Sequence, residues 1–173
     1  MDQTLVAAAS DTPSEADLAF EELYRSSRDD VYAYVAGLLR DRSAAEEVTA
    51  TAFERAFRKR RRFDSRRGGP RAWLFGIARN AALDELRRRR RQAELADPAD
   101  VGRPQANQDE RRAVVAAALG SLDARERELV ALKFYGELTN GELASVLRTS
   151  ESNVGTRLHR AVAKLREACH VEA

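Results

Sequence analysis

The chain has 173 residues, of which 43% are hydrophobic and 34% charged, so it is long enough for one ordinary domain or two small ones. This length excludes a large multidomain enzyme, and the apolar content excludes a wholly disordered chain. The single cysteine, Cys169, excludes an internal disulfide bond and a zinc site built on cysteines, and is typical of a reducing compartment. Since no segment has the pattern of a signal peptide or a membrane span, we expect a cytoplasmic protein without membrane insertion.

Acidic and basic side chains are segregated along the chain, although the formal net charge is only +2. Residues 1–54 contain 12 acidic and 4 basic side chains, which gives a net charge of −8. Residues 55–91 contain 3 acidic and 15 basic side chains, which gives +12. This asymmetry predicts that one face of the protein binds a polyanion and that another partner binds elsewhere.

Two helices are predicted in the acidic part of the chain. Ser14 followed by Asp17 marks the start of the first helix, in which apolar residues recur at helical spacing. The polar residues 40–42 interrupt that pattern. Ser43 and Glu46 then have the spacing of a capping box, in which each side chain bonds a free backbone amide, so we expect the second helix to begin there.

A third helix is predicted over residues 72–91, after a loop over residues 62–71 that contains two glycines and a proline. Apolar residues repeat through this helix at helical spacing, and it ends in five consecutive arginines, Arg87 to Arg91. The periodicity is then lost over residues 92–108, where prolines and a glycine appear. Such a stretch is typical of a polar linker.

The last part of the chain has the pattern of a helix-turn-helix. Asp123 with Glu126 and Thr139 with Glu142 form two further cap pairs, and the turn is expected at residues 148–150. The helix after the turn begins with short hydroxyl and amide side chains followed by arginines, which suit base edges and phosphates in a DNA major groove. The alternative interpretation is an ordinary helical hairpin with a solvated polar face.

No segment has the pattern of a β-strand, so the predicted fold is all-α, with two small helical domains joined by a flexible linker. The expected parts are a disordered N-terminal tail over residues 1–13, a first domain over 14–92, the linker over 93–112 and a second domain over 113–173.

The basic segment also contains aromatic residues, a mixture typical of proteins that bind single-stranded nucleic acid. In such proteins cations follow the phosphate backbone while aromatic rings stack on bases. Aromatic residues on a helical stripe are more often core, so we assign Phe57, Trp73 and Phe75 mainly to packing. Phe63, in the loop, is the stronger candidate for a base contact.

The sequence offers little for an enzyme or a metal site. It has no phosphate-binding loop, no zinc-protease motif and no nucleophile with an adjacent base. His159 has no histidine or cysteine at metal-ligand spacing. We therefore expect no enzymatic activity, no catalytic residue, no metal and no cofactor.

Two sets of residues point to a known family when they are taken together. The first set runs from Ala45 to Phe57, continues in Arg62-Phe63-Asp64 and ends in the segment from Ala72 to Asn80, with Asp84 and Arg87 beyond it. The second set runs from Thr156 to Ala161 and continues in Lys164 to Arg166. The chain closely resembles the extracytoplasmic-function (ECF) group of the sigma-70 family, bacterial RNA polymerase initiation factors that have only sigma domains 2 and 4. The resemblance covers nearly the whole chain beyond the N-terminal tail.

The resemblance implies three binding surfaces on an RNA polymerase sigma factor, which gives the core enzyme its promoter specificity. The second helix would dock on the clamp helices of the largest polymerase subunit, with the second domain on the flap of the second-largest one. The polymerase-binding residues would be Glu46, Glu47, Thr51, Glu54 and Arg55. The residues that melt the minus-10 element and capture an extruded base would be Arg62, Phe63, Asp64, Arg71, Trp73, Arg79, Asn80, Asp84 and Arg87. The minus-35 element would be read by Thr139, Ser150, Ser152, Asn153, Thr156, Arg157 and Arg160.

Asn80 is the strongest candidate for reading a base edge, and the alternative is an amide that bonds between helices. The chain departs from the family at Ala50-Thr51, where many members carry a Gln-acid pair, so a carboxylate expected at Thr51 is absent. The departure puts polymerase affinity in doubt. The partners implied are core RNA polymerase, promoter DNA and an anti-sigma factor, and the alternative function is a stand-alone helix-turn-helix regulator derived from the sigma scaffold.

Overall fold

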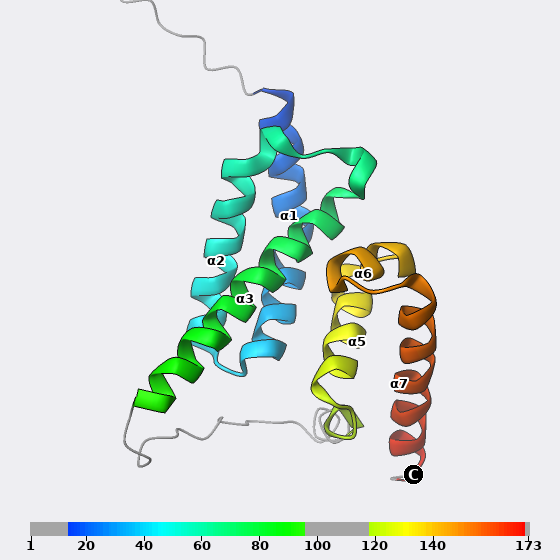
Figure 1. The fold of residues 1–173 in the computed structure, drawn as a ribbon. Coiled ribbons are helices and arrows are strands. Elements are labelled where there is room, and N and C mark those ends of the chain that lie inside the picture. The colour runs from blue at the N-terminus through cyan, green and yellow to red at the C-terminus, as the bar shows by residue number, and fades with distance from the viewer. Residues whose placement is uncertain (1–13, 96–117, 172–173) are drawn as a thin grey trace, which may run out of the picture.

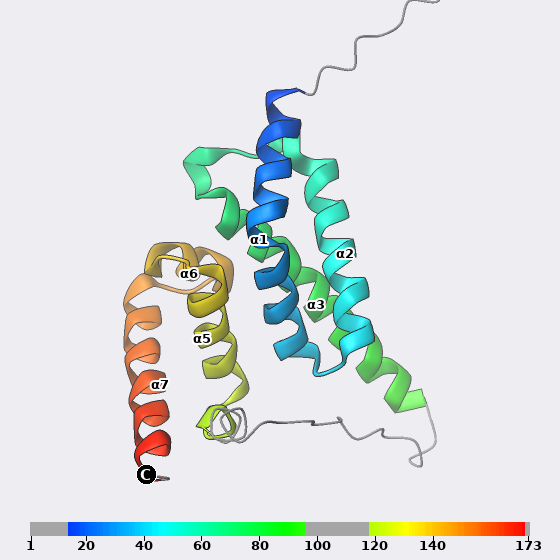
Figure 2. The same ribbon diagram turned by 180° about the vertical axis from the view of Figure 1, so that it is seen from behind.

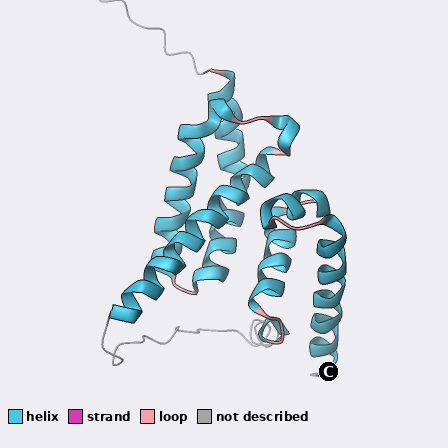
Figure 3. Ribbon diagram, viewed as in Figure 1, coloured by secondary structure: helices cyan, strands magenta, loops and turns pink. Residues whose placement is uncertain are grey.

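The structure is a computed structural model that describes residues 14–95 and 118–171. These two ranges contain helices and no β-strand, so the predicted all-α fold is confirmed (Figures 1 and 3). The N-terminal half is formed by α1 (Glu15–Leu39), α2 (Arg42–Lys59), the 3-10 helices η1 (Arg60–Arg62) and η2 (Ser65–Arg67), and α3 (Pro70–Leu95). The C-terminal half is formed by α5 (Ala124–Gly136), α6 (Asn140–Leu147) and α7 (Glu151–Val171).

The starts of the first two helices follow from local hydrogen bonds. Ser14 caps α1 as expected, because its hydroxyl accepts from the Asp17 amide while the Asp17 carboxylate accepts from the Ser14 amide. The expected Ser43 and Glu46 capping box is wrong. Asp41 caps α2 instead, since its carboxylate accepts from the Ala44 amide, and the helix begins at Arg42. Aspartate and serine are about equally good N-cap residues, and here Asp41, which comes earlier in the chain than Ser43, is the cap.

The connection between α2 and α3 is more ordered than a plain loop. The segment expected as a loop over residues 62–71 contains η2 and the end of η1. Gly68 has φ +138°, a backbone conformation that side chains rarely adopt, so glycine suits this bend before α3. The third helix runs from Pro70 to Leu95, longer than the expected 72–91, so residues 93–95 belong to the helix rather than to the linker. The expected tail over 1–13 and the rest of the linker up to residue 112 lie outside the described residues.

The helix starts of the C-terminal half are confirmed. Asp123 and Thr139 each form a capping box, with Glu126 and Glu142 respectively. The Ser150 hydroxyl accepts from the Asn153 amide at 3.2 Å at the start of α7. The turn before α7 begins at Arg148, which has a left-handed backbone, so α6 and α7 form the predicted helix-turn-helix.

The two halves lie against each other, with α5 beside α1 and α3 on one side and beside α7 on the other (Figure 2). Buried residues of both halves join one hydrophobic cluster, in which Tyr34, Phe75 and Leu129 are fully buried. Phe57, expected in the core, is 44% exposed and packs edge-on against Phe20 at 5.3 Å. Because a small core contributes limited stability, polar contacts are also important in holding the two halves together.

The free energy of unfolding is expected to fall in acid. Hydrogen bonds from Arg88 and Arg89 lower the pKa of Glu85 from 4.5 to about 2, and hydrogen bonds from Ser14 and Arg60 lower the pKa of Asp17 from 3.8 to about 2. Since the unfolded chain binds these protons more tightly, the stabilisation is complete above about pH 5 and is lost as the pH falls towards 2. Urea denaturation at several pH values measures this slope. Glu85→Gln should make the slope shallower, and an unchanged slope would contradict the role of Glu85.

Candidate nucleic-acid and polymerase surfaces

Five of the nine residues expected at the minus-10 element line one cavity of about 340 Å³. These are Arg62, Phe63, Asp64, Trp73 and Asn80. The first three come from the connection after α2, whereas Trp73 and Asn80 lie two turns apart on α3. The rings of Phe63 and Trp73 are 5.3 Å apart and tilted by 51°, so they form one aromatic wall. The cavity therefore combines two rings, an exposed amide and the guanidinium groups of Arg62, Arg67 and Arg148, which are the kinds of group needed to hold an unstacked base.

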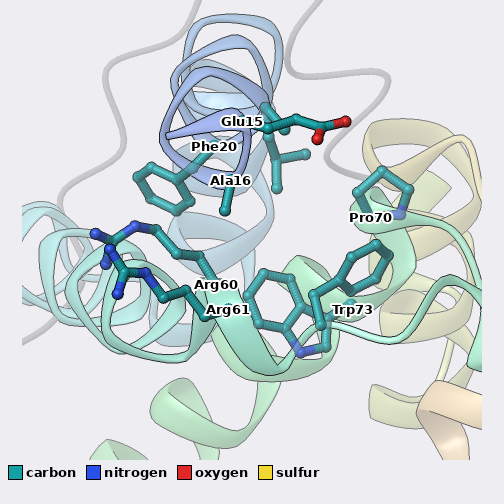
Figure 4. A pocket seen from close by; sticks show the side chains of 10 residues that line it. Glu15, Ala16, Phe20, Arg60, Arg61, Pro70 and Trp73 are labelled. Atoms are coloured by element: carbon teal, nitrogen blue, oxygen red, sulfur yellow. The ribbon is translucent and has the colours of Figure 1, made fainter. Parts of the chain in front are cut away.

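The same aromatic pair lines a second hollow of about 400 Å³ beside the start of α1. Figure 4 shows Trp73 and Pro70 across from the α1 residues Glu15, Ala16 and Phe20, with Arg60 and Arg61 along one side. The Arg60 guanidinium already has partners within the protein. It donates to the Asp17 carboxylate and, at 2.8 Å, to the Phe57 carbonyl oxygen, and it lies 3.7 Å from the centre of the Phe57 ring. This second hollow thus has an apolar side and a basic side, on which Arg60 is paired with Asp17.

Asp64 is an acid inside an otherwise basic loop, and its charge is balanced locally. Both of its carboxylate oxygens accept from the Arg66 guanidinium, at 2.9 and 3.1 Å, and one also accepts from the Arg66 amide. These bonds hold the pKa of Asp64 below its ordinary value. Asp64 therefore orders the loop and leaves little negative charge to repel a phosphate.

Arg71 and Arg79, also expected at the minus-10 element, do not line the cavity. Arg79 forms an ion pair with Glu128 of α5, with 2.7 Å between its Nε and the carboxylate. Arg71 donates to the carbonyl oxygens of Tyr135 and Gly136 at the end of α5. Both side chains are mostly buried, at 25% and 20% exposure, and both lie in the contact between the two halves.

Asp84 and Arg87, the last two residues of that set, lie on the side of α3 that faces α2. Asp84 pairs with Arg87 at 3.1 Å and with Arg55 of α2 at 3.4 Å. Asp84 and Arg55 line a cleft of about 540 Å³ between the two helices, together with Glu47 and Thr51. The structure therefore joins part of the expected minus-10 set to the expected polymerase-binding set.

The remaining expected polymerase-binding residues are already paired on the surface of α2. Glu46 pairs with Arg42 at 3.5 Å and Glu54 pairs with Arg58 at 2.6 Å, both one helical turn apart. All four side chains are more than half exposed, so a partner can replace these weak ion pairs. The α2 surface is accessible and rich in both signs of charge.

The seven residues expected at the minus-35 element gather at the start of α6 and along the first turns of α7. Thr139 and Ser150 are caps, while Ser152, Asn153, Thr156 and Arg160 are exposed on α7 and Arg157 is partly exposed. The Asn153 amide nitrogen donates to the Thr149 hydroxyl at 2.7 Å, which orients the side chain. Ser152, Thr156 and Arg160 are four residues apart, so they lie in a row on one face of the helix.

The comparisons with known proteins decide the family. Family models of sigma-70 region 2 and sigma-70 region 4 match residues 23–92 and 112–165. The ECF RNA polymerase sigma factor SigK of Mycobacterium tuberculosis (strain ATCC 25618 / H37Rv) is 32% identical over 162 residues, which are 88% of this chain and 87% of SigK. The chain belongs to the ECF group of the sigma-70 family. This sigma factor is also 26% identical over 155 residues to SigM of Bacillus subtilis (strain 168), which are 86% of this chain and 94% of SigM.

Two solved structures share the fold. The sigma factor RpoE in its complex with the anti-sigma factor NepR from Bartonella quintana superposes with a TM-score of 0.75 at 21% identity, over 90% of this chain and 99% of RpoE. CnrH in its complex with the cytosolic domain of CnrY gives 0.65 at 28% identity, over 90% of each chain. The all-α fold with two helical halves is thus shared with the sigma factor RpoE and with CnrH.

The sequence did not single out the groups that join the two halves of the sigma factor. They are Glu128, the partner of Arg79; the carbonyl oxygens of Tyr135 and Gly136, which accept from Arg71; and Gly69, whose amide donates to Glu142 at 3.2 Å. The sequence also did not single out Ser27 and Asp30 of α1, which hold Arg71 from within the N-terminal half. Only Ser27 leaves a signal, a polar residue in the buried stripe of α1, where it is fully buried. Residues 14–95 and 118–171 contain no helix long and apolar enough to cross a membrane and no acidic, histidine or cysteine cluster that would hold a metal.

Proposed function

We propose that this sigma factor captures an unpaired minus-10 base in the cavity lined by Phe63, Trp73 and Asn80. The observation that carries the proposal is that five of the expected minus-10 residues, from two separate segments, converge on one cavity. Taking a base out of a duplex costs a few kcal/mol, and stacking on aromatic rings returns about 1–3 kcal/mol per base. The exposed Asn80 amide can donate to and accept from a base edge, and Arg62 supplies positive charge for the phosphate.

The start of α7 is proposed to read the minus-35 element in the major groove. The row of Ser152, Thr156 and Arg160 is exposed, and an α-helix fits the width of the groove. The Ser150 cap leaves the free amides of the first turn close to the same face, where they favour a phosphate. Residues 14–92 would then act as sigma domain 2 and residues 113–173 as sigma domain 4.

The protein partners are proposed from the family. The α2 surface with Glu46, Glu47 and Arg55 would dock on the clamp helices of the largest polymerase subunit, and the C-terminal half on the flap of the second-largest one. An anti-sigma factor is a further proposed partner, since the sigma factor RpoE, which shares this fold, was solved in a complex with the anti-sigma factor NepR. We propose no enzymatic role.

Binding of the purified chain to bacterial core RNA polymerase tests the proposal. We expect the two to co-migrate on a sizing column, and an excess of the housekeeping sigma factor to displace the chain. Transcription from promoter DNA by the co-migrating complex should then depend on Asn80. If the chain does not bind core polymerase but binds duplex DNA by itself, it is instead a stand-alone regulator. The basic and aromatic segment over residues 55–91 would then need another explanation.

Restoring an acid at position 51 is expected to tighten polymerase binding. Thr51 is partly exposed in the cleft with Glu47 and Asp84, where a carboxylate would add negative charge towards the partner. The gain should be about two- to fivefold in Kd for Thr51→Glu, the range of an exposed ion pair. Thr51→Gln, of similar size but neutral, is the matched control. Equal affinities of the two variants and the wild type in a fluorescence titration with core enzyme would show that the missing acid is irrelevant.

A further inference from the structure

The short turn that precedes Phe63 has few contacts of its own. This turn, η1, contains no buried residue, and no side chain caps its start. Phe63 follows η1 directly, and its amide donates to the Arg60 carbonyl oxygen at 3.3 Å. The position of the Phe63 ring therefore depends on what holds Arg60, the first residue of the turn.

Arg60 connects this turn to both α1 and α2. Its Nε donates to the Asp17 carboxylate in the first turn of α1, and its Nη1 donates to the Phe57 carbonyl oxygen near the end of α2 at 2.8 Å. The guanidinium also lies 3.7 Å from the centre of the Phe57 ring, a distance at which the ring attracts a cation. Phe57 packs in turn against Phe20 of α1. The half-exposed Phe57 ring is thus the surface on which Arg60 rests.

Asp17, the acidic partner of Arg60, is itself fixed in place. Its second carboxylate oxygen accepts from the Ser14 amide at 3.1 Å and from the Ser14 hydroxyl at 2.6 Å. Hydrogen bonds from Ser14 and Arg60 lower the pKa of Asp17 to about 2, so this carboxylate is ionised at neutral pH. The side chains of Arg60 and Asp17 are 18% and 29% exposed, which limits screening by salt. A charged, oriented and partly shielded carboxylate is a strong partner for a guanidinium.

The two arginines that follow Arg60 in the chain have different surroundings. Arg61 and Arg62 are both exposed, and within residues 14–95 and 118–171 neither of them forms an ion pair. Arg62 lines the cavity proposed for the base, whereas Arg60 lines only the hollow beside α1, on the other side of the Phe63 and Trp73 rings. Three consecutive arginines therefore differ in what they can do, and Arg60 is the one that the protein itself binds.

We propose that Arg60 is a positioning residue for base capture, which holds η1 against the start of α1 so that the Phe63 ring is in place before a base arrives. The proposal rests on the proposed function. A ring that is fixed in advance saves the conformational entropy that an unanchored connection would lose when the base binds. Arg60 acts through Phe63 and touches no base itself.

Trp73 reports directly on the position of Phe63. It is the only tryptophan of the chain, and its ring lies 5.3 Å from that of Phe63, so acrylamide quenching of its fluorescence measures how well Phe63 covers it. We expect Arg60→Gln to increase the quenching in the free chain towards the value of Phe63→Ala. Arg61→Gln removes the same charge from an exposed neighbour and is the matched control, which should keep the wild-type value. Circular dichroism checks that each variant is folded.

Asp17 separates a positioning role of Arg60 from a direct contact with phosphate. Asp17→Ala removes the carboxylate that holds Arg60, and Ser14→Ala is the matched control, because it weakens the same helix cap but keeps that carboxylate. With core polymerase and promoter DNA, we expect Arg60→Gln and Asp17→Ala each to reduce the permanganate reactivity of minus-10 thymines by about five- to thirtyfold, the factor for ordering the backbone of one residue. The double variant should lose no more than Arg60→Gln alone, because the two residues act as one unit.

Three results would overturn the positioning role of Arg60. The first is Trp73 quenching in Arg60→Gln that equals that of the wild type. The second is full activity of Asp17→Ala beside a defect in Arg60→Gln, because a guanidinium released from Asp17 would then still do its work on DNA. The third is a double variant whose loss is the product of the two single losses. Full activity of Phe63→Ala would contradict the proposed function instead, while the quenching would still show whether Arg60 holds Phe63.

Discussion

Phe75→Ala is expected to lower the free energy of unfolding by about 3–5 kcal/mol, the usual cost of removing a buried phenylalanine. The Phe75 side chain is fully buried on α3, and its ring lies 5.6 Å from that of Tyr34 on α1. The Arg71 guanidinium is 5.6 Å from the same ring, so the aromatic pair also supports the arginine that reaches α5. A cavity at this position would weaken the core and the contact between the halves together.

Urea denaturation followed by circular dichroism measures this loss. The loss would be a large fraction of the 5–15 kcal/mol that domains usually have, so the variant should unfold at a much lower urea concentration (about half or less). Phe134→Ala is the matched control, because Phe134 is 76% exposed and touches mainly the edge of Tyr135. The control should change stability by less than about 0.5 kcal/mol. Similar losses in the two variants would contradict the assignment of Phe75 to the core.

The helix starts show which part of the fold could be predicted from the sequence. Ser14, Asp123 and Thr139 were predicted as caps because a capping box depends on two residues three positions apart, and the structure confirms all three. The prediction failed at Ser43, where Asp41 lies two residues earlier and caps the helix first. Capping patterns in the sequence thus locate the helices. They do not decide which of two good cap residues, two positions apart, begins the helix.

The residues expected at the minus-10 element show which contacts could not be predicted from the sequence. Phe63, Trp73 and Asn80 converge because the bend after α2 and two turns of α3 place them together, and their chemistry was visible in the sequence. The position of Arg79 was not predictable in the same way, since its partner Glu128 is 49 residues away and carries no local pattern. A long-range ion pair depends on how the halves pack, which neither spacing nor composition reveals.

Long-range and local ion pairs also neutralise part of the basic run from Arg87 to Arg91. Arg88 and Arg89 both bond Glu85, and Arg89 also pairs with Asp41 at the start of α2. Part of the +12 of the basic segment therefore fixes the end of α3 against α2. The charge that remains for a phosphate path is smaller than the sequence alone suggests, and it is concentrated around the loop that follows α2.

Phe63→Ala is expected to reduce the formation of open promoter complexes by about 5- to 150-fold, which corresponds to the 1–3 kcal/mol of a stacked base. Phe63 is partly exposed in the connection after α2, and it forms the cavity wall together with Trp73. Its ring is therefore available to a base at little cost to the fold. Trp73 is a poorer choice for this test, because it also packs against the core, so its loss would mix stability with binding.

Permanganate reactivity of unpaired thymines in the minus-10 region measures open complexes directly. Binding of the variant to core polymerase should be unchanged, since Phe63 lies away from the cleft between α2 and α3. A template that is already unpaired at the minus-10 element should restore part of the activity, because the cost of extruding the base is then removed while its stacking energy is still missing. Full activity of Phe63→Ala on duplex promoters would place base capture elsewhere. The hollow beside α1, which shares this aromatic pair, would then be the next surface to test.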